Sequence, residues 1–131
     1  MEKHVANAEV VANYLHNHAK VSWVSYAGLE ESNYFHLAKK YLPKGAGSVF
    51  TFGIKGGYDA GVKFVEKCQL LSHLANIGDT RSLVLHPAST THRQLTETQR
   101  ISAGAGDDVI RLSIGLETVE DIIADLEQAL R

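Results

Sequence analysis

The sequence predicts an α/β sandwich in which a small, mainly antiparallel sheet carries helices packed on one face. Two observations indicate this fold class. Segments with apolar residues at helical spacing alternate with short segments rich in β-branched and aromatic residues, and the connections between them are short. The 131 residues contain neither repeats nor low-complexity tracts and suit one domain with its own core. The sequence leaves open whether some strands pair in parallel.

In the first half of the chain, residues 3–18, 33–42 and 58–69 are predicted as helices, because their apolar residues recur every three or four positions. In the third helix these are Val62, Val65, Cys68 and Phe64, which should face inward. Residues 21–27 and 48–54 are predicted as strands. In the second strand the alternation places Phe50, Phe52 and Ile54 on one face.

In the second half, residues 70–76 should be a short extended piece, and residues 82–86 a strand that ends at Pro87. Thr96 and Gln99 have the spacing of a capping box, so a short helix should begin there and end at Gly104. Residues 109–114 are predicted as a strand. A last helix follows Thr118, with an apolar stripe of Val119, Ile122, Ile123, Leu126 and Leu130. Its acidic residues Asp121, Asp125 and Glu127 are expected on a solvated face.

Composition excludes several classes of function. Hydrophobic residues make up 44% and charged residues 21%, as in ordinary globular proteins. The net charge of −2 provides no electrostatic footprint for nucleic acid or an anionic membrane. No apolar run approaches the roughly 20 residues of a membrane span, and the N-terminus lacks the apolar centre of a secretory signal. The single cysteine, Cys68, excludes an internal disulfide and fits a reducing, cytoplasmic compartment.

Arg111 lies inside an otherwise apolar predicted strand. Side chains alternate along a strand, so Ile110, Leu112 and Ile114 should share the core face, while Arg111 lies on the other. Periodicity alone favours a solvated arginine on an open sheet face. The alternative is a carboxylate-binding role, since the guanidinium forms paired, charge-assisted hydrogen bonds.

Two polar segments precede this strand. Asn76-Ile77-Gly78-Asp79 has the composition of a turn, and by itself indicates nothing more. His86-Pro87-Ala88-Ser89-Thr90-Thr91-His92 is rich in hydroxyl groups after a proline, which alone marks only a loop. Metal sites are not indicated, because the histidines lack ligand-like spacing, and Lys55-Gly56-Gly57 lacks the spacing of a phosphate-binding loop.

Together, the order and separation of these segments resemble the C-terminal part of the Cys/Met-metabolism family of pyridoxal-phosphate enzymes. The segment Arg-Leu-Ser-Ile-Gly-Leu-Glu from Arg111 looks like the family's Arg-Leu-Ser-Val-Gly-(Ile/Leu)-Glu motif. The resemblance implies that Arg111 holds the α-carboxylate of an amino-acid substrate, that Asn76 helps with the Ile77 backbone nearby, and that Thr91 lies near the same carboxylate. The asparagine at 76, where related enzymes have serine, favours the O-acetylhomoserine sulfhydrylase branch.

The same resemblance implies the cofactor and partners. Pyridoxal-phosphate chemistry requires a Schiff-base lysine, and no lysine here, Lys39 and Lys40 included, lies in the family's cofactor motif. The cofactor is therefore expected in a full-length enzyme whose larger, upstream domain binds it, and not in this chain alone, which should be inactive by itself. Residues 1–131 would be the domain that closes over the substrate, as in fold-type I enzymes of this kind, in a homo-oligomer that is tetrameric in the family.

A second hypothesis comes from another class of protein. A standalone small α/β module that binds a ligand or forms a dimer would share the expected fold but not the constellation of Arg111, Asn76 and Thr91. A reading frame that continues upstream into a lysine-bearing cofactor domain would favour the enzyme. A domain of that enzyme should also expose an apolar patch beside Asn76 and Arg111, where the two domains meet.

Overall fold

The computed structural model describes residues 1–131 and is built on one five-stranded sheet. The strand order is β1 (Val21–Ser25), β2 (Val49–Ile54), β5 (Val109–Ser113), β4 (Leu83–Leu85) and β3 (Ser72–His73). All neighbouring pairs are antiparallel except β3 with β4, which is parallel. The mainly antiparallel sheet is thus confirmed. The sequence left parallel pairing open, and the structure contains one parallel pair, β3 with β4, at the edge of the sheet. The predicted extended piece at 70–76 shortens to the two residues of β3.

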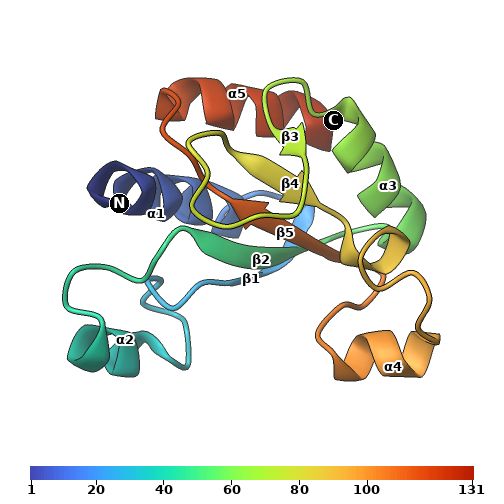
Figure 1. Ribbon diagram of the computed structural model, residues 1–131, viewed down its shortest axis with the longest axis horizontal. Helices are drawn as coiled ribbons and strands as arrows, with labels where there is room; N and C mark the ends of the chain where they lie inside the picture. The colour runs from blue at the N-terminus through green and yellow to red at the C-terminus, as the bar shows by residue number, and fades with distance from the viewer.

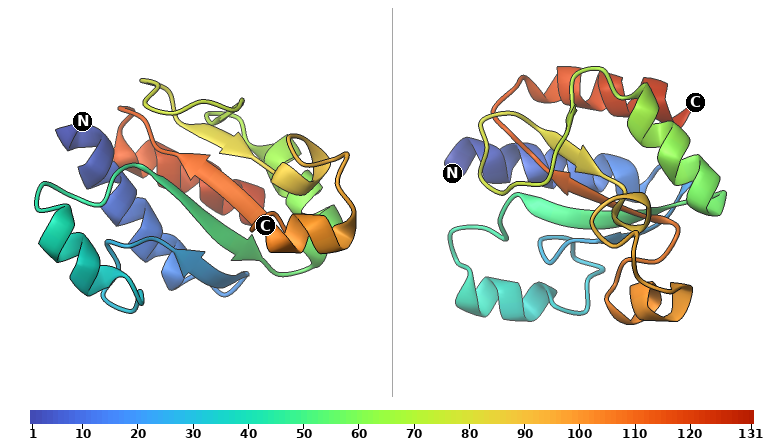
Figure 2. Two further views of the ribbon diagram at one scale, coloured as in Figure 1. Left: turned by 60° about the horizontal axis from the view of Figure 1, so that its bottom comes forward. Right: turned by 45° about the vertical axis from the view of Figure 1, so that its right-hand side comes forward.

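Three longer helices cover one face of the sheet (Figure 1). They are α1 (Glu2–His16), α3 (Gly57–Lys67) and α5 (Val119–Leu130). Two short helices, α2 (Phe35–Tyr41) and α4 (Glu97–Ser102), lie on the other side at the periphery, as two further views show (Figure 2). Between β4 and α4 the chain makes a single 3-10 turn, η1 (Pro87–Ser89). The capping box predicted at Thr96 is present, with the Thr96 hydroxyl accepting from the Gln99 N–H.

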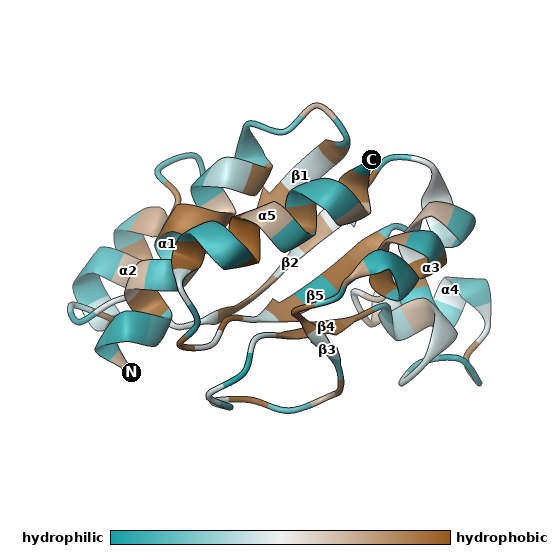
Figure 3. Ribbon diagram, turned by 90° about the horizontal axis from the view of Figure 1, so that it is seen from above, coloured by the Kyte–Doolittle hydropathy of each residue, from teal (hydrophilic) through white to brown (hydrophobic).

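The core lies between the sheet and these three helices, where the hydrophobic residues gather (Figure 3). Phe50, Phe52 and Ile54 are buried on one face of β2, and Ile110, Leu112 and Ile114 are fully buried along β5, as the alternation predicts. The inner side of α3 consists of Gly61, Phe64 and Val65. Val62 and Cys68, which were expected there, are only half-buried, although Cys68 still packs against the core.

The opposite face of the sheet is also covered, but only toward β4. Leu83, Leu85 and Val109 are buried there although strand alternation places them away from the helical core. The 3-10 turn η1 lies against β5, and its Ala88 is buried as well. Around Arg111 and Thr51 this face is only half-buried.

Asp125 corrects one prediction. Its side chain was expected on the solvated face of the last helix, yet the residue is only 6% exposed. Its carboxylate accepts hydrogen bonds from the backbone N–H groups of Gln69, Leu70 and Leu71, at 2.8 to 3.0 Å. These three donors follow the end of α3 and have no helical partner, so Asp125 joins α3 to α5. The apolar periodicity of α5 could not predict these backbone partners, because they lie more than 50 residues away in the sequence.

Replacing Asp125 by alanine should destabilise the fold by about 2–3 kcal/mol, because three backbone donors lose a charged acceptor. Burial raises the pKa of Asp125, but the hydrogen bonds from Leu71, Gln69, Gln128 and Leu70 outweigh it and leave the pKa lowered. A lowered pKa means that this stabilisation is present above the unfolded-state pKa and is lost as the pH falls through the folded-state value. Urea denaturation at pH 7 and at pH 3 would measure both effects. Asp121→Ala on the exposed side of the same helix is the control, and an equal loss in both variants would contradict the assignment.

Candidate substrate-carboxylate site

Arg111 lies at the centre of β5, opposite Thr51 of β2 and Leu85 of β4. Its side chain points away from the helical core, as alternation requires, and is half-buried. No carboxylate of the chain forms an ion pair with it. Its one hydrogen bond is long, from Nη2 to the carbonyl oxygen of Asn76 at 3.4 Å. The structure therefore brings Arg111 to the predicted turn and leaves most of its donors free.

The turn itself is exposed and satisfies one of its own donors. The Ile77 N–H donates to Oδ1 of Asn76 at 2.8 Å, while Gly78 takes a left-handed conformation with φ of +73°. This bond holds the orientation of the Asn76 carboxamide, and its Nδ2 group has no hydrogen-bond partner in the chain. The available donor at this position is thus the Asn76 side chain, because the Ile77 N–H is already occupied.

The base of the turn is held firmly. Arg81 donates to both carboxylate oxygens of Asp79, at 2.9 to 3.3 Å, and these bonds hold the pKa of Asp79 below its usual value. The next residue, Thr80, accepts a backbone hydrogen bond from the Leu116 N–H at 2.8 Å. These hydrogen bonds fix the residues that follow the exposed tip of the turn, beside the end of β5.

Two residues of the Arg111 motif, Gly115 and Glu117, serve this anchoring. Glu117 accepts hydrogen bonds from the N–H and the hydroxyl of Ser82, both at 2.8 Å, and the Ser82 hydroxyl accepts from the Gly115 N–H at 2.9 Å. A Cβ atom at Gly115 would lie 2.5 Å from the backbone carbon of Arg81. Sequence reasoning assigned neither residue a role; the only signal was their place in the motif.

Thr91 lies farther from this pair. It follows η1 on an exposed segment, and its hydroxyl is 2.8 Å from Nδ1 of His92, with no hydrogen bond to Arg111 or Asn76. Its loop starts at His86, directly after Leu85, the residue that pairs with Arg111. The structure thus joins Arg111 to Asn76 by a direct contact, and to Thr91 only through the neighbouring strand.

His86 fixes the start of this loop and was not singled out by sequence reasoning. It is fully buried, and its Nε2 lies 2.7 Å from the Asp107 carbonyl, which can only accept, so Nε2 carries the hydrogen. Its Nδ1 is 2.8 Å from the hydroxyl of Ser89, and Thr90 donates to its carbonyl at 2.8 Å. A histidine at the end of an apolar strand, followed by proline, was the available signal.

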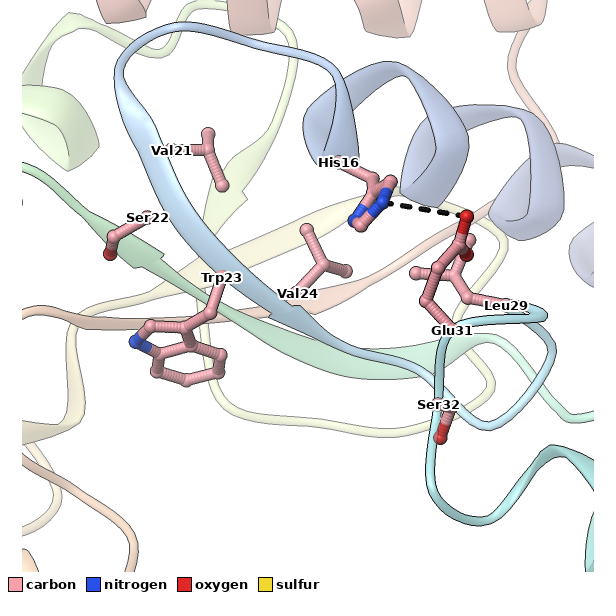
Figure 4. Close-up of a pocket in the computed structure, with 8 residues that line it drawn as sticks. All are labelled: His16, Val21, Ser22, Trp23, Val24, Leu29, Glu31 and Ser32. Carbon is pink, nitrogen blue, oxygen red and sulfur yellow. Dashed lines mark ion pairs between the residues drawn. The ribbon is translucent and has the colours of Figure 1, made fainter.

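The main concavities of the surface lie elsewhere. A pocket of about 260 Å³ beside β1 is lined by His16, Val21, Ser22, Trp23, Val24, Leu29, Glu31 and Ser32 (Figure 4). Its only ion pair joins His16 and Glu31 at 3.6 Å, at the surface, where such pairs contribute little. Neither Arg111 nor Asn76 lines this or the other four pockets described. None of these five pockets therefore joins Arg111 to the Asn76 turn.

The loop that carries Asn76 exposes apolar side chains. Leu74 is 41% exposed and Ile77 is 69% exposed. Two such side chains do not by themselves form the contiguous apolar patch that marks a contact surface. Their position beside Asn76 and Arg111 is where the sequence predicts a contact with a catalytic partner.

The residues of this chain do not fit pyridoxal phosphate by themselves. Every lysine is exposed, whereas a Schiff-base lysine must lie in an enclosed site with groups that hold the phosphate. The Cys68 thiol is no alternative nucleophile, because burial, and secondarily the charge of Asp125, raise its pKa to about 12.

No cluster of three or more histidine, cysteine or acidic side chains is arranged to hold a metal ion. None of the helices combines the length and the apolar character needed to cross a bilayer.

Comparison with known proteins places these residues in a family. The family described as Cys/Met metabolism PLP-dependent enzyme matches residues 1–131. The chain belongs to this family. Its fold is that of a solved chain from Campylobacter jejuni, assigned as an O-acetylhomoserine (thiol)-lyase and containing N′-pyridoxyl-lysine-5′-monophosphate, with a TM-score of 0.91 at 45% identity. That match covers 98% of this chain and 31% of the other.

Two relatives are informative in sequence. A homocysteine synthase of Schizosaccharomyces pombe is 54% identical over 130 residues, which cover 99% of this chain and 30% of the relative. An O-acetyl-L-homoserine sulfhydrylase of Thermus thermophilus is 47% identical over 129 residues, covering 98% of this chain and 31% of the relative. This chain thus spans less than a third of the length of these two relatives. The family match confirms the expected family and its dependence on pyridoxal phosphate.

Proposed function

We propose that residues 1–131 are the substrate-closing, C-terminal domain of a pyridoxal-phosphate-dependent O-acetylhomoserine sulfhydrylase. In this proposal the domain binds the α-carboxylate of the amino-acid substrate. The observation that carries it is the contact between Arg111, on the sheet face away from the helical core, and the Asn76 turn. The identities of 45–54% to sulfhydrylases, a homocysteine synthase and a thiol-lyase support the choice of reaction.

The proposed binding mode follows from the donors available. The planar guanidinium of Arg111 would form two parallel bonds to the carboxylate, and its long bond to the Asn76 carbonyl is weak enough to be exchanged for them. The Asn76 Nδ2 group would donate to one carboxylate oxygen, since Ile77 holds the amide in the required orientation. Thr91 would lie at the outer side of the site, and the Ile77 N–H would contribute by fixing Asn76.

The reaction proposed for the whole protein is γ-replacement. O-acetyl-L-homoserine and sulfide or a thiol would give homocysteine or methionine, together with acetate. Pyridoxal phosphate carries the bond-breaking chemistry in such enzymes, and here residues outside this chain would hold it. The proposed partners are an upstream domain that binds the cofactor, on which activity depends, and further copies of the same protein in a homo-tetramer. The proposed compartment is the cytoplasm.

The competing hypothesis, a standalone binding module, has no observation of its own in its favour. Its expected fold is the same, but the contact between Arg111 and Asn76 and the family membership are both accounted for by the enzyme.

Asn76→Asp in the full-length protein tests the proposal. It should raise KM for O-acetylhomoserine by roughly tenfold with little change in KM for sulfide, because a neutral donor becomes an anion that repels the carboxylate. Steady-state kinetics with each substrate varied in turn would measure this. Asn13→Asp introduces the same charge on an exposed part of α1 and is the matched control. An unchanged KM in the Asn76 variant would show that the turn does not meet the carboxylate.

A further inference from the structure

Helix α1 contacts both parts of the candidate site through two buried polar residues. His4 and Asn7 lie one turn apart on the same side of the helix, and each is only 6% exposed. His4 Nε2 lies 3.0 Å from the Asp79 carbonyl oxygen; because a carbonyl only accepts, Nε2 is the donor. Asn7 donates through Nδ2 to the carbonyl oxygens of Gly115 at 3.1 Å and Glu117 at 2.9 Å.

These three acceptors belong to the two segments that make the site. Asp79 is the last residue of the Asn76 turn, and Gly115 follows the strand of Arg111 by two residues. The two segments also bind each other, through the Leu116 N–H to Thr80 and through Ser82 to Glu117. One face of α1 therefore contacts the place where the turn meets the end of the strand. The bonded residues are separated from His4 and Asn7 by 75 to 110 positions in the sequence.

Burial alone does not explain polar residues at these two positions. The rest of the buried side of α1 is apolar, with Ala8, Val11, Ala12 and Leu15 all fully buried. A buried polar group costs free energy unless it is hydrogen-bonded, and two apolar residues would fill the same space without that requirement. His4 and Asn7 can fix the positions of their partner loops, which apolar residues cannot. Each hydrogen bond forms only when the acceptor carbonyl of the loop lies at one position.

We propose that His4 and Asn7 are positioning residues of the carboxylate site, which hold the Asn76 turn and the Arg111 strand at the separation that one carboxylate requires. This inference rests on the proposed function. Neither residue touches the substrate. Their role is geometric: two donors on separate segments bind one carboxylate only if their spacing is fixed to within about half an ångström, and an error near 1 Å can cost roughly a hundredfold.

The test uses the full-length protein and separates geometry from stability. His4→Leu removes the donor, whereas His4→Gln retains an N–H at nearly the same reach. Asn7→Asp keeps the shape but places a carboxylate against two carbonyl oxygens. His16→Leu and Asn13→Asp are controls at exposed positions of the same helix. For each variant, kcat and KM are measured for O-acetylhomoserine and for sulfide, with the inhibition constants of homoserine and homoserine amide, which differ only in the carboxylate.

We expect His4→Leu and Asn7→Asp to raise KM for O-acetylhomoserine by roughly tenfold or more. The preference for homoserine over its amide should fall in the same variants, while KM for sulfide stays constant and kcat changes by less than about threefold. His4→Gln should restore most of the preference, and the two controls should match the wild type. If Asn7→Asp does not fold, the comparison of His4→Leu with His4→Gln still decides.

Two results overturn the inference in different ways. If Arg111→Ala abolishes the preference for homoserine but the α1 variants retain it, His4 and Asn7 are merely structural and the proposed function stands. If the wild type itself shows no preference, or Arg111→Ala leaves it unchanged, the proposed carboxylate site fails and the inference fails with it.

Discussion

Arg111→Ala in the full-length protein should weaken the use of O-acetylhomoserine at least tenfold, measured as kcat/KM. The variant removes a charge-assisted pair worth about 1.5–3 kcal/mol. No carboxylate of the chain pairs with Arg111, so its loss leaves no buried charge behind, and the fold should remain intact. The cofactor should still bind, because in the proposed enzyme the lysine that holds it lies outside this chain. Visible absorbance of the bound cofactor and circular dichroism would verify both points.

Arg111→Lys is the informative companion to this variant. It keeps the positive charge but replaces the planar fork by a single ammonium group, so only part of the lost activity should return. Arg81→Ala is a suitable control, because Arg81 is an exposed arginine paired with Asp79. Full activity in Arg111→Lys would mean that charge alone matters at this position. Full activity in Arg111→Ala would remove the carboxylate role altogether.

Gly115→Ala should destabilise the protein by about 3 kcal/mol, near the upper end for overpacking. The added Cβ would meet the backbone of residues 80–82, including the Ser82 nitrogen at 2.6 Å, and backbone cannot swing aside as a flexible side chain can. Relief requires the loop to move, which breaks the bonds that Ser82 forms with Glu117 and Gly115. Chemical denaturation followed by circular dichroism would measure the loss.

Gly106→Ala is the matched control for this prediction. Its Cβ would lie 3.4 Å from a side-chain oxygen of Asp108, which is an ordinary contact, and its φ is not positive. This variant should leave the free energy of unfolding nearly unchanged. Alanine also reduces the conformational freedom of the unfolded chain, which favours the folded state. Equal stabilities of the two variants would show that the junction at Gly115 is looser than its geometry indicates.

Local pattern determined much of this protein. The apolar spacing located the helices, and alternation along residues 109–114 placed Arg111 opposite the core without any knowledge of the neighbouring strands. The capping box at Thr96 was also predictable, because both partners lie within four residues. The candidate site was predicted from motif and order, through the resemblance, since no single segment was specific.

The tertiary structure alone decided which polar residues are buried and what they bind. Asp125 has the spacing of a solvated helix residue, yet it caps the backbone after α3, more than 50 residues away. His4 and Asn7 reach loops 75 to 110 residues downstream, and Glu117 reaches back 35 residues to Ser82. Periodicity reports only which face of its own element a residue occupies. The partner of a polar group depends on which strands are neighbours in the sheet, here in the order β1-β2-β5-β4-β3, and packing of the whole chain sets that order.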